Sequence, residues 1–300
     1  MKLAGVFTVL QTPLTENDQI DEQVFEREIE WLIECGVDGV VLAMVSEVLR
    51  FSAEERRRLW QLVLKLVRGR IPLVASVGAE STAIATMLSS WALNDGVAAL
   101  MATPPAAFAY LPGEISKYYV AIIESVSCPV IVQDASNYLG QPLDVSLYVD
   151  LIDAYGQERV QFKPEAKPVK ERLEALKNKS GGRARVFEGQ GGADLLDTFP
   201  VGIVGTMPGA EIPWALVALW KALTVDNWKR ARAIHAPLLK LVSFQTTLDA
   251  YIAVEKYLLV KQGIFTSTRQ RGPLGFVLSA AVQSQIDLEF EGLRAAVDRG

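Results

Sequence analysis

The sequence is poor in the residues that form disulfides and transition-metal sites. Its 300 residues include two cysteines and one histidine. Cys35 and Cys128 lie far apart, in a pattern that fits neither a disulfide framework nor a zinc site, so a reducing cytoplasm is the expected location. His235 cannot form a histidine-rich metal site alone, and it lies within a helical pattern. We therefore expect His235 to be structural.

The chain also lacks an excess of basic residues and a long apolar run. It has 30 basic and 35 acidic residues, for a net charge of −5. Nucleic-acid-binding proteins usually have a basic face or tail, so no nucleic-acid partner is expected. No apolar run reaches the ~18 residues that cross a bilayer, so no membrane partner is expected either. Residues 1–10 lack the cleavage site of a signal peptide and are predicted to form a strand.

What the sequence does contain is a regular succession of short, β-prone apolar runs. Most of them are continuous rather than alternating, as expected for parallel strands that are covered on both faces. Eight strands are predicted, at Ala4–Leu10, Val37–Met44, Ile71–Gly78, Val97–Pro104, Pro129–Ala135, Val160–Pro164, Arg185–Gln190 and Val201–Pro208.

Amphipathic helices are predicted between these strands. Ser52 and Glu55 form a capping box ahead of one helix, and Gly36 stands where another should end. The shortest interval leaves room only for a short helix, at Ala193–Phe199. Eight repeats of strand and helix predict a TIM (β/α)8 barrel, because repeated right-handed crossovers close the sheet.

The strand pattern stops after Pro213. Three helical patterns follow, at about Trp228–Phe244, Thr247–Gln262 and Gly275–Asp298. We predict a catalytic barrel over residues 1–220 and a C-terminal three-helix extension over residues 221–300. The extension is expected to pack on the barrel rather than to act as a separate functional domain.

Polar residues that follow the strands are the first candidates for a site, since barrel active sites lie at the carboxyl ends of the strands. Among the lysines, Lys163 alone ends a predicted strand. Apolar surroundings disfavour a charged amine and favour the nucleophilic form, as Schiff-base formation with a ketone requires. The alternative is an ion pair with Glu165 or Glu188 that only closes the barrel.

Motifs spread along the chain carry a resemblance to a known family. They are Pro13 with Asp21, Gly36-Val37-Asp38-Gly39, Ser46-Glu47, Thr103-Pro104, Lys163, Gly202 to Met207, and Arg271-Gly272-Pro273-Leu274. In these places the chain resembles the dihydrodipicolinate synthase / N-acetylneuraminate lyase family of class I, Schiff-base-forming aldolases. The resemblance implies that Lys163 forms an imine with a 2-keto acid, and that no metal or organic cofactor is needed. It also implies a homotetramer built as a dimer of dimers.

Some positions differ from the usual family pattern. The family usually has Gly-Thr-Thr-Gly-Glu after strand 2, whereas this chain has Ala43-Met44-Val45-Ser46-Glu47. Gln133 stands in place of a proton-shuttling tyrosine, and Tyr138 in place of an arginine that binds a second carboxylate in dihydrodipicolinate synthase. The L-2-keto-3-deoxyarabonate dehydratases are similar to this chain in its Ser46-Glu47, in Gln133-Asp134-Ala135 and in the segment Gly202 to Met207.

The resemblance implies a lyase, either a dehydratase or an aldolase, that acts on a 2-keto acid such as a 2-keto-3-deoxy sugar acid. Lys163 and Gln133 are the predicted catalytic residues. The predicted substrate-binding residues are Val45, Ser46, Gly205 and Met207. Glu47 is expected to be structural, by accepting hydrogen bonds from backbone amides.

Three alternatives remain open from the sequence. The chain could be a dihydrodipicolinate synthase or an N-acetylneuraminate-type aldolase, or a catalytically weakened barrel that binds keto acids. A Mg²⁺ site made from Glu47, Asp134, Glu165 and Glu188 is the competing chemistry, although no spacing supports it.

Overall fold

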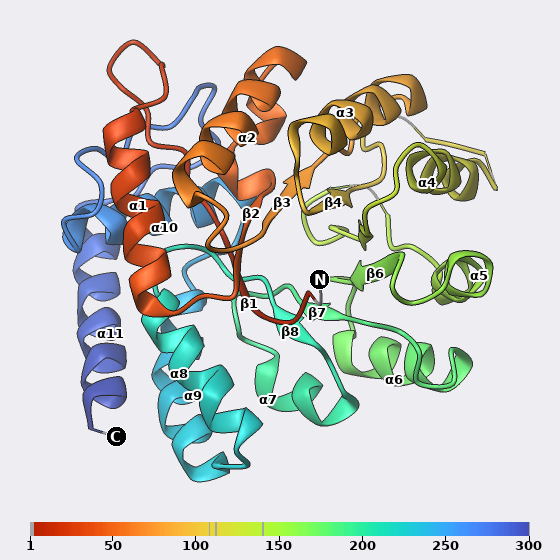
Figure 1. Ribbon diagram of the computed structural model, residues 1–300. Helices are drawn as coiled ribbons and strands as arrows, with labels where there is room; N and C mark the ends of the chain where they lie inside the picture. The colour runs from red at the N-terminus through yellow and green to blue at the C-terminus, as the bar shows by residue number, and fades with distance from the viewer. Residues whose placement is uncertain (1–2, 108, 112, 140, 300) are drawn as a thin grey trace. The chain divides into compact units, whose positions relative to one another are not determined.

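The computed structural model describes residues 3–107, 109–111, 113–139 and 141–299. Within them, strands and helices alternate along the chain as predicted (Figure 1). The strands of the sheet are β1 (Gly5–Val9), β2 (Gly39–Leu42), β3 (Leu73–Ser76), β4 (Ala99–Ala102), β5 (Val130–Gln133), β6 (Val160–Lys163), β7 (Phe187–Glu188) and β8 (Gly205–Thr206).

Helices follow each of these strands. They are α1 (Glu22–Cys35), α2 (Ala53–Val67), α3 (Thr82–Asp95), α4 (Glu114–Glu124), α5 (Val145–Tyr155), α6 (Val169–Lys179), α7 (Leu195–Thr198), α8 (Pro213–Thr224), α9 (Trp228–Val242), α10 (Leu248–Lys261) and α11 (Ala280–Asp298). Three 3₁₀ turns add η1 (Met44–Ser46), η2 (Val48–Arg50) and η3 (Phe199–Val201). This order is that of the predicted (β/α)8 barrel, with α9, α10 and α11 as the C-terminal extension.

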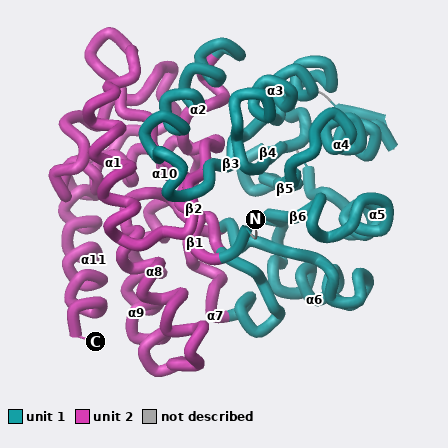
Figure 2. Tube along the Cα trace, in the orientation of Figure 1, with its two compact units in different colours: residues 1–4, 52–189, 197–205 teal, residues 5–51, 190–196, 206–300 magenta. Residues whose placement is uncertain are grey.

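The chain forms two compact units, which Figure 2 distinguishes by colour. Unit 1 comprises residues 1–4, 52–189 and 197–205, and unit 2 comprises residues 5–51, 190–196 and 206–300. In unit 1, β3, β4, β5 and β6 pair in parallel in that order. In unit 2, β1 pairs in parallel with β2. The boundary at residue 220 was drawn from the strand pattern and stays a prediction.

The sequence signals at the helix ends are confirmed. Asp21 accepts a hydrogen bond from Val24 N at the start of α1, and Gly36 ends that helix at a φ of 83°. Ser52 and Glu55 form the predicted capping box of α2. A positive φ costs glycine little, which explains why Gly36 stands at this helix end.

Two predicted boundaries were wrong by four or five residues. The last strand was predicted to begin at Val201, but Val201 ends η3 and Gly202 has a φ of 104°, so only Gly205–Thr206 is extended. The last helix begins at Ala280 rather than at Gly275, because Ser279 caps its first turn by accepting from Val282 N. Gly275 N instead donates a hydrogen bond to Asp249.

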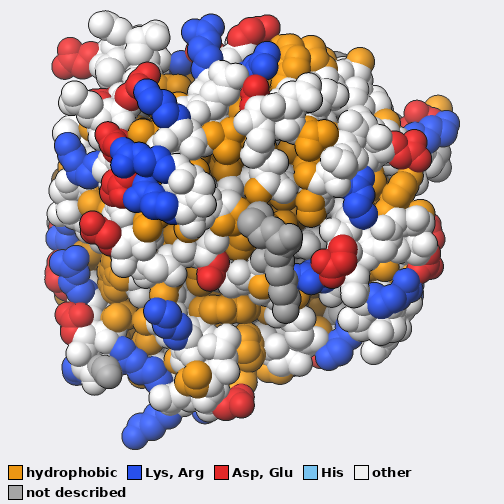
Figure 3. All heavy atoms as spheres, viewed as in Figure 1, with side chains coloured by type: hydrophobic (Ala, Val, Ile, Leu, Met, Phe, Trp, Pro, Cys, Tyr) orange, Lys and Arg blue, Asp and Glu red, His pale blue; other side chains and the backbone are white. Residues whose placement is uncertain are grey.

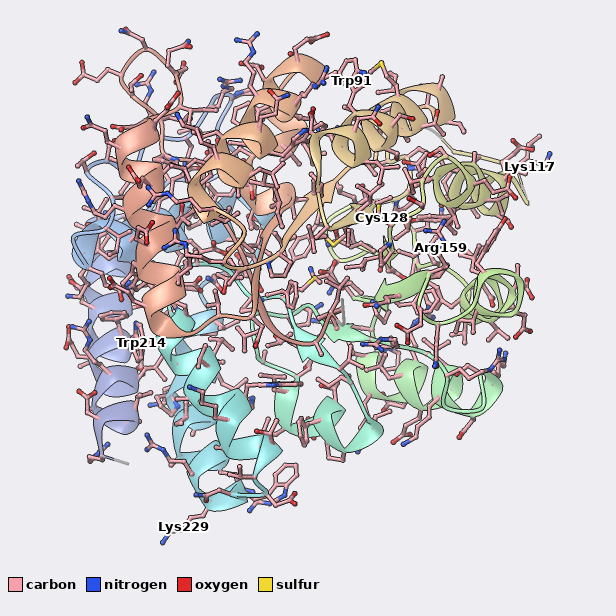
Figure 4. All side chains as sticks on the ribbon, viewed as in Figure 1. Trp91, Lys117, Cys128, Arg159, Trp214 and Lys229 are labelled. Carbon is pink, nitrogen blue, oxygen red and sulfur yellow. The ribbon has the colours of Figure 1, made fainter. Side chains whose placement is uncertain are left out.

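Polar side chains inside the fold mainly satisfy backbone groups. Arg159, which Figure 4 labels beside Cys128, donates to the carbonyl oxygens of Ile123, Val126 and Cys128. His235 Nε2 donates to the Ala193 carbonyl oxygen at 2.8 Å, which confirms its structural role. Buried carbonyls need such donors, since an unpaired polar group inside a protein costs free energy.

Across the described parts of the chain, no helix combines the length and apolar character that a bilayer crossing demands. On the face drawn in Figure 3, acidic and basic side chains are interspersed rather than gathered into a field of one sign.

Candidate active site

The register of two neighbouring strands brings the two predicted catalytic residues together. β5 and β6 pair so that Gln133 lies opposite Lys163, each as the last residue of its strand. Residues paired in register project from the same face of a sheet. Both side chains are buried, with 1% of Gln133 and 5% of Lys163 exposed.

Glu165 links these two side chains. Lys163 Nζ lies 2.5 Å from Glu165 Oε1. Gln133 Nε2 lies 3.3 Å from each carboxylate oxygen of the same residue. The ion pair considered as the alternative role for Lys163 is therefore present, and its carboxylate also contacts the second predicted catalytic residue.

The carbonyl oxygen of the Gln133 side-chain amide is available as a hydrogen-bond acceptor. Gln133 Oε1 is buried and has no hydrogen-bond partner among the residues that the structure describes. Unpaired buried acceptors are uncommon in folded proteins, because a lost hydrogen bond to water is not replaced. This oxygen can accept a hydrogen bond from a hydroxyl that enters the site.

Gly189 allows the cluster to pack against the segment after β7. A β-carbon at this position would lie 2.7 Å from Glu165 Oε1 and 2.9 Å from Lys163 Cε. Real β-carbons do not make such close contacts, so a larger residue would displace the Lys163–Glu165 pair. From the sequence, Glu165 was considered only as an ion-pair partner of Lys163 or as a Mg²⁺ ligand, and Gly189 was not considered for the site.

The turn that carries the predicted substrate-binding residues Val45 and Ser46 lies in unit 2, and hydrogen bonds to the protein hold it. Ser46 Oγ donates to the Leu10 carbonyl oxygen at 2.5 Å and accepts from Ala43 N. Thr12 Oγ1 donates to the Ser46 carbonyl oxygen, and Ser46 N donates to the Ala43 carbonyl. The only hydroxyl hydrogen of Ser46 is thus directed at the protein.

Val45 offers a backbone N–H as a candidate donor in this turn. It lies in the first turn of η1, where backbone N–H groups have no acceptor within the helix, and its side chain is half-buried. Substrate binding by Val45 and Ser46 stays a prediction, and it now depends on the Val45 amide more than on the Ser46 hydroxyl.

Glu47 has the structural role that was predicted, with partners that the sequence did not indicate. Its Oε2 accepts from Arg271 N at 2.7 Å, and its Oε1 from Lys256 Nζ at 2.5 Å. Lys256 is fully buried and also donates to the Arg269 carbonyl oxygen. Burial lowers the pKa of Lys256, and the Glu47 carboxylate opposes that shift.

Three more carboxyl groups are buried in unit 2. Gln11 N donates to Glu28, Gln11 Nε2 donates to Glu255, and Gln245 Nε2 donates to Glu211. Burial raises the pKa of all three carboxyls, and the charge of Glu211 raises that of Glu255 further. No group of three or more histidine, cysteine or acidic side chains in the described chain could hold a metal ion.

The remaining candidates, Gly205 and Met207, fall in different units. Gly205 belongs to unit 1 and Met207 to unit 2, where Met207 is buried. Asp134 accepts hydrogen bonds from Ser136 N, Leu143 N and Tyr148 Oη, so it holds the turn after β5. Roles for Gly205 and Met207 in substrate binding stay predictions.

Tyr118 and Tyr119 are packing residues. Both are buried, and their rings meet edge to face at 5.3 Å between centroids. Burial raises the pKa of Tyr118 to about 12. Tyr118 Oη bonds to backbone groups of Ala79 and Thr103.

Comparison with known proteins gives this geometry a context. The family model described as the dihydrodipicolinate synthetase family matches residues 2–287. The L-2-keto-3-deoxyarabonate dehydratase of Azospirillum brasilense is 25% identical over 278 residues, which cover 90% of this chain and 88% of that protein. The N-acetylneuraminate lyase of Rhizobium meliloti (strain 1021) is 32% identical over 133 residues, 44% of each chain.

The fold has the same relatives. The solved structure of 4-hydroxy-tetrahydrodipicolinate synthase from Methylacidiphilum fumariolicum SolV matches with a TM-score of 0.89 at 25% identity, over 99% of this chain and 98% of that one. The predicted TIM barrel and the predicted lyase class are confirmed. The chain belongs to the dihydrodipicolinate synthetase family, and it is a class I aldolase or lyase of that family.

Proposed function

We propose that this protein is a Schiff-base lyase that dehydrates a 2-keto-3-deoxy sugar acid at Lys163. The observation that carries the proposal is the buried cluster of Lys163, Glu165 and Gln133, in which one carboxylate contacts both other side chains. An amine, a proton acceptor and a neutral hydrogen-bonding amide are the groups that this reaction needs.

The first half of the reaction uses Lys163 and Glu165. The ammonium gives a proton to Glu165 Oε1, and the free amine adds to C2 of the keto acid. Glu165 returns this proton to the C2 oxygen, which leaves as water and gives an iminium ion. This cation attracts electrons from C3, so Glu165 takes a proton from C3 and an enamine forms.

The second half removes the C4 hydroxyl. The enamine electrons expel this group, and a proton from Glu165 converts it into water. Hydrolysis of the conjugated iminium then releases the dehydrated keto acid and the Lys163 amine. The net change is the loss of one water from the substrate.

Gln133 favours dehydration over aldol cleavage. An amide has no accessible pKa, so Gln133 cannot take the proton-transfer role of a tyrosine. Its NH2 holds Glu165, and its unpaired Oε1 can accept from the C4 hydroxyl. The 25% identity to a protein named as an L-2-keto-3-deoxyarabonate dehydratase, over 90% of this chain, supports the same reaction.

Borohydride trapping tests the proposal. Pyruvate with borohydride is expected to add one reduced pyruvyl group at Lys163, as found by intact mass and peptide mapping. Lys163→Ala should abolish the adduct while circular dichroism stays unchanged, and Lys167→Ala, which removes an exposed lysine nearby, should leave it intact. An adduct that persists in Lys163→Ala contradicts the mechanism.

A second assay tests the reaction type. The purified protein should dehydrate 2-keto-3-deoxypentonates in preference to releasing pyruvate from N-acetylneuraminate. Pyruvate release at a comparable rate would assign the site to aldol chemistry. We also propose a homotetramer, on the basis of the family, and light scattering of the purified protein tests it.

A further inference from the structure

Unit 1 contains an apolar hollow at the opposite strand ends from Lys163. Helix α6 and the segments leading into β7 and β8 form it, and it has a cavity volume of about 160 Å³ and opens to solvent. Sites for drug-sized ligands usually span roughly 300–1,000 Å³, so this hollow suits a smaller molecule. The lining residues are Leu173, Leu176, Lys177, Gly182, Ala184, Val186, Val201, Gly202 and Ile203.

The hollow is separate from the active site within this unit. Val186 and Ile203 precede β7 and β8, so they lie at the amino ends of these strands. Lys163 and Gln133 end β6 and β5, at the carboxyl ends. A ligand in the hollow would therefore not occupy the place of the keto acid.

Lys177 supplies the one charge of the lining. Its Nζ lies 3.9 Å from the position that a β-carbon on Gly202 would take, so the ammonium stands over the rim. Within the described chain, no carboxylate forms an ion pair with Lys177. A cation beside an apolar wall and without a protein partner is suited to an anionic ligand.

The Lys177 ammonium is not needed to compensate the carbonyl groups at the end of helix α6. Lysines in a last helical turn often compensate the free carbonyl groups there. Here the Leu176, Lys177 and Asn178 carbonyls already accept from Ser180 N, Gly182 N and Gly181 N. The Lys177 ammonium is therefore available to pair with a ligand in the hollow.

We propose that this hollow binds a small organic monocarboxylate with a compact apolar body, the carboxylate pairing with Lys177. One ammonium matches one negative charge, whereas a phosphate dianion would need further donors that the apolar walls do not provide. The walls, of which Leu173, Leu176, Val186 and Ile203 are each at most 9% exposed, would cover the apolar body.

The test uses 4-methylpentanoate, which lacks a keto group and so cannot form an imine with Lys163. Methyl-labelled protein should show saturable shifts at the Leu173, Leu176, Val186, Val201 and Ile203 methyls in NMR titration. The uncharged 4-methylpentanamide should bind at least about tenfold more weakly, as expected for the loss of one charge-assisted contact. Shifts confined to methyls outside the hollow would overturn the proposal.

Variants separate the charge from the walls. Lys177→Met should lower the affinity for the acid to that of the amide, while the matched Lys179→Met, on the same helix but outside the lining, should bind like the wild type. Ala184→Leu should fill the hollow and abolish binding of both probes. Equal affinity of Lys177→Met and wild type for the acid contradicts the proposal, as does displacement of the acid by equimolar inorganic phosphate.

Folding and the active site provide the controls. Each variant should keep the wild-type circular dichroism and borohydride adduct, since none of the exchanged residues takes part in the hydrogen bonds that join Lys163, Glu165 and Gln133. If Ala184→Leu does not fold, Lys177→Met with the acid–amide comparison still decides the outcome.

Discussion

At the residue scale, Glu165 is the proton carrier that we propose in place of the missing tyrosine. Its carboxylate is 1% exposed and lies within hydrogen-bond reach of Lys163 and Gln133. A buried carboxylate beside an ammonium can exchange a proton without a relay through solvent. Loss of the usual tyrosine is therefore compatible with an active enzyme.

Glu165→Gln should lower kcat by about 100- to 10,000-fold, the usual scale for removing a general acid or base. The amide keeps the size of the side chain, so the fold should be preserved. Single-turnover dehydration measures the effect. A kcat within about threefold of the wild type would mean that Glu165 only closes the barrel.

Gln133→Ala should lower kcat by about 10- to 1,000-fold, because a contact to the departing hydroxyl and to Glu165 is lost. Imine formation depends on Lys163 and should remain trappable with pyruvate. Comparing dehydration rates with trapping yield separates the two steps. Equal losses in both would show that Gln133 shapes the site generally, and wild-type rates would show that it is a core amide.

At the scale of elements, helix α10 holds the turns that follow β1 and β2 in unit 2. Its consecutive residues Glu255 and Lys256 contact Gln11 after β1 and Glu47 after β2. Glu47 has a φ of 62°, a conformation that few non-glycine residues adopt unless other contacts hold it. The turn that carries Val45 is thus fixed by a helix far away in the sequence.

Lys256→Met should destabilise the protein by about 3–5 kcal/mol, because it leaves the buried Glu47 carboxylate without its partner. Urea denaturation measures this change. The double variant Lys256→Met/Glu47→Gln should recover part of the loss, since the orphaned charge is gone. A single variant within about 1 kcal/mol of the wild type would argue against a buried ion pair.

The site residues that could be predicted from the sequence are those whose positions follow from the strand pattern. Lys163 and Gln133 end consecutive apolar strands, so their proximity was predictable from strand pattern and family resemblance. The roles of Gly189 and Lys256 were not predictable, because they depend on contacts with residues 24 or more positions away. Gly189 approaches Glu165, and Lys256 pairs with Glu47. The Ser46 hydroxyl was expected to face substrate, but its partner, Leu10, belongs to another strand end.

At the scale of the whole molecule, the buried carboxyls should make stability depend on pH. Burial raises the folded-state pKa of Glu28, Glu211 and Glu255 above the ordinary value of 4.5, so the folded protein binds protons that the unfolded chain releases. Stability should then fall as pH rises above that value, by about 1.4 kcal/mol per pH unit for each such proton.

Glu255→Gln isolates this effect. The amide needs no proton, so the free energy of unfolding should fall less steeply between the ordinary carboxyl value and neutral pH. The exposed Glu174→Gln on α6 is the matched control and should follow the wild type. Denaturation midpoints at several pH values measure the slopes, and parallel curves for Glu255→Gln and wild type would contradict the assignment.

The pairing of Gln133 with Lys163 also ties catalysis to folding. Side chains alternate between the faces of a strand, so a shift of one residue between β5 and β6 would turn one partner away from the other. A misaligned chain could be compact and still be unable to form the cluster with Glu165. Recovery of imine trapping during refolding would thus report correct strand alignment, which collapse or helix content alone would not reveal.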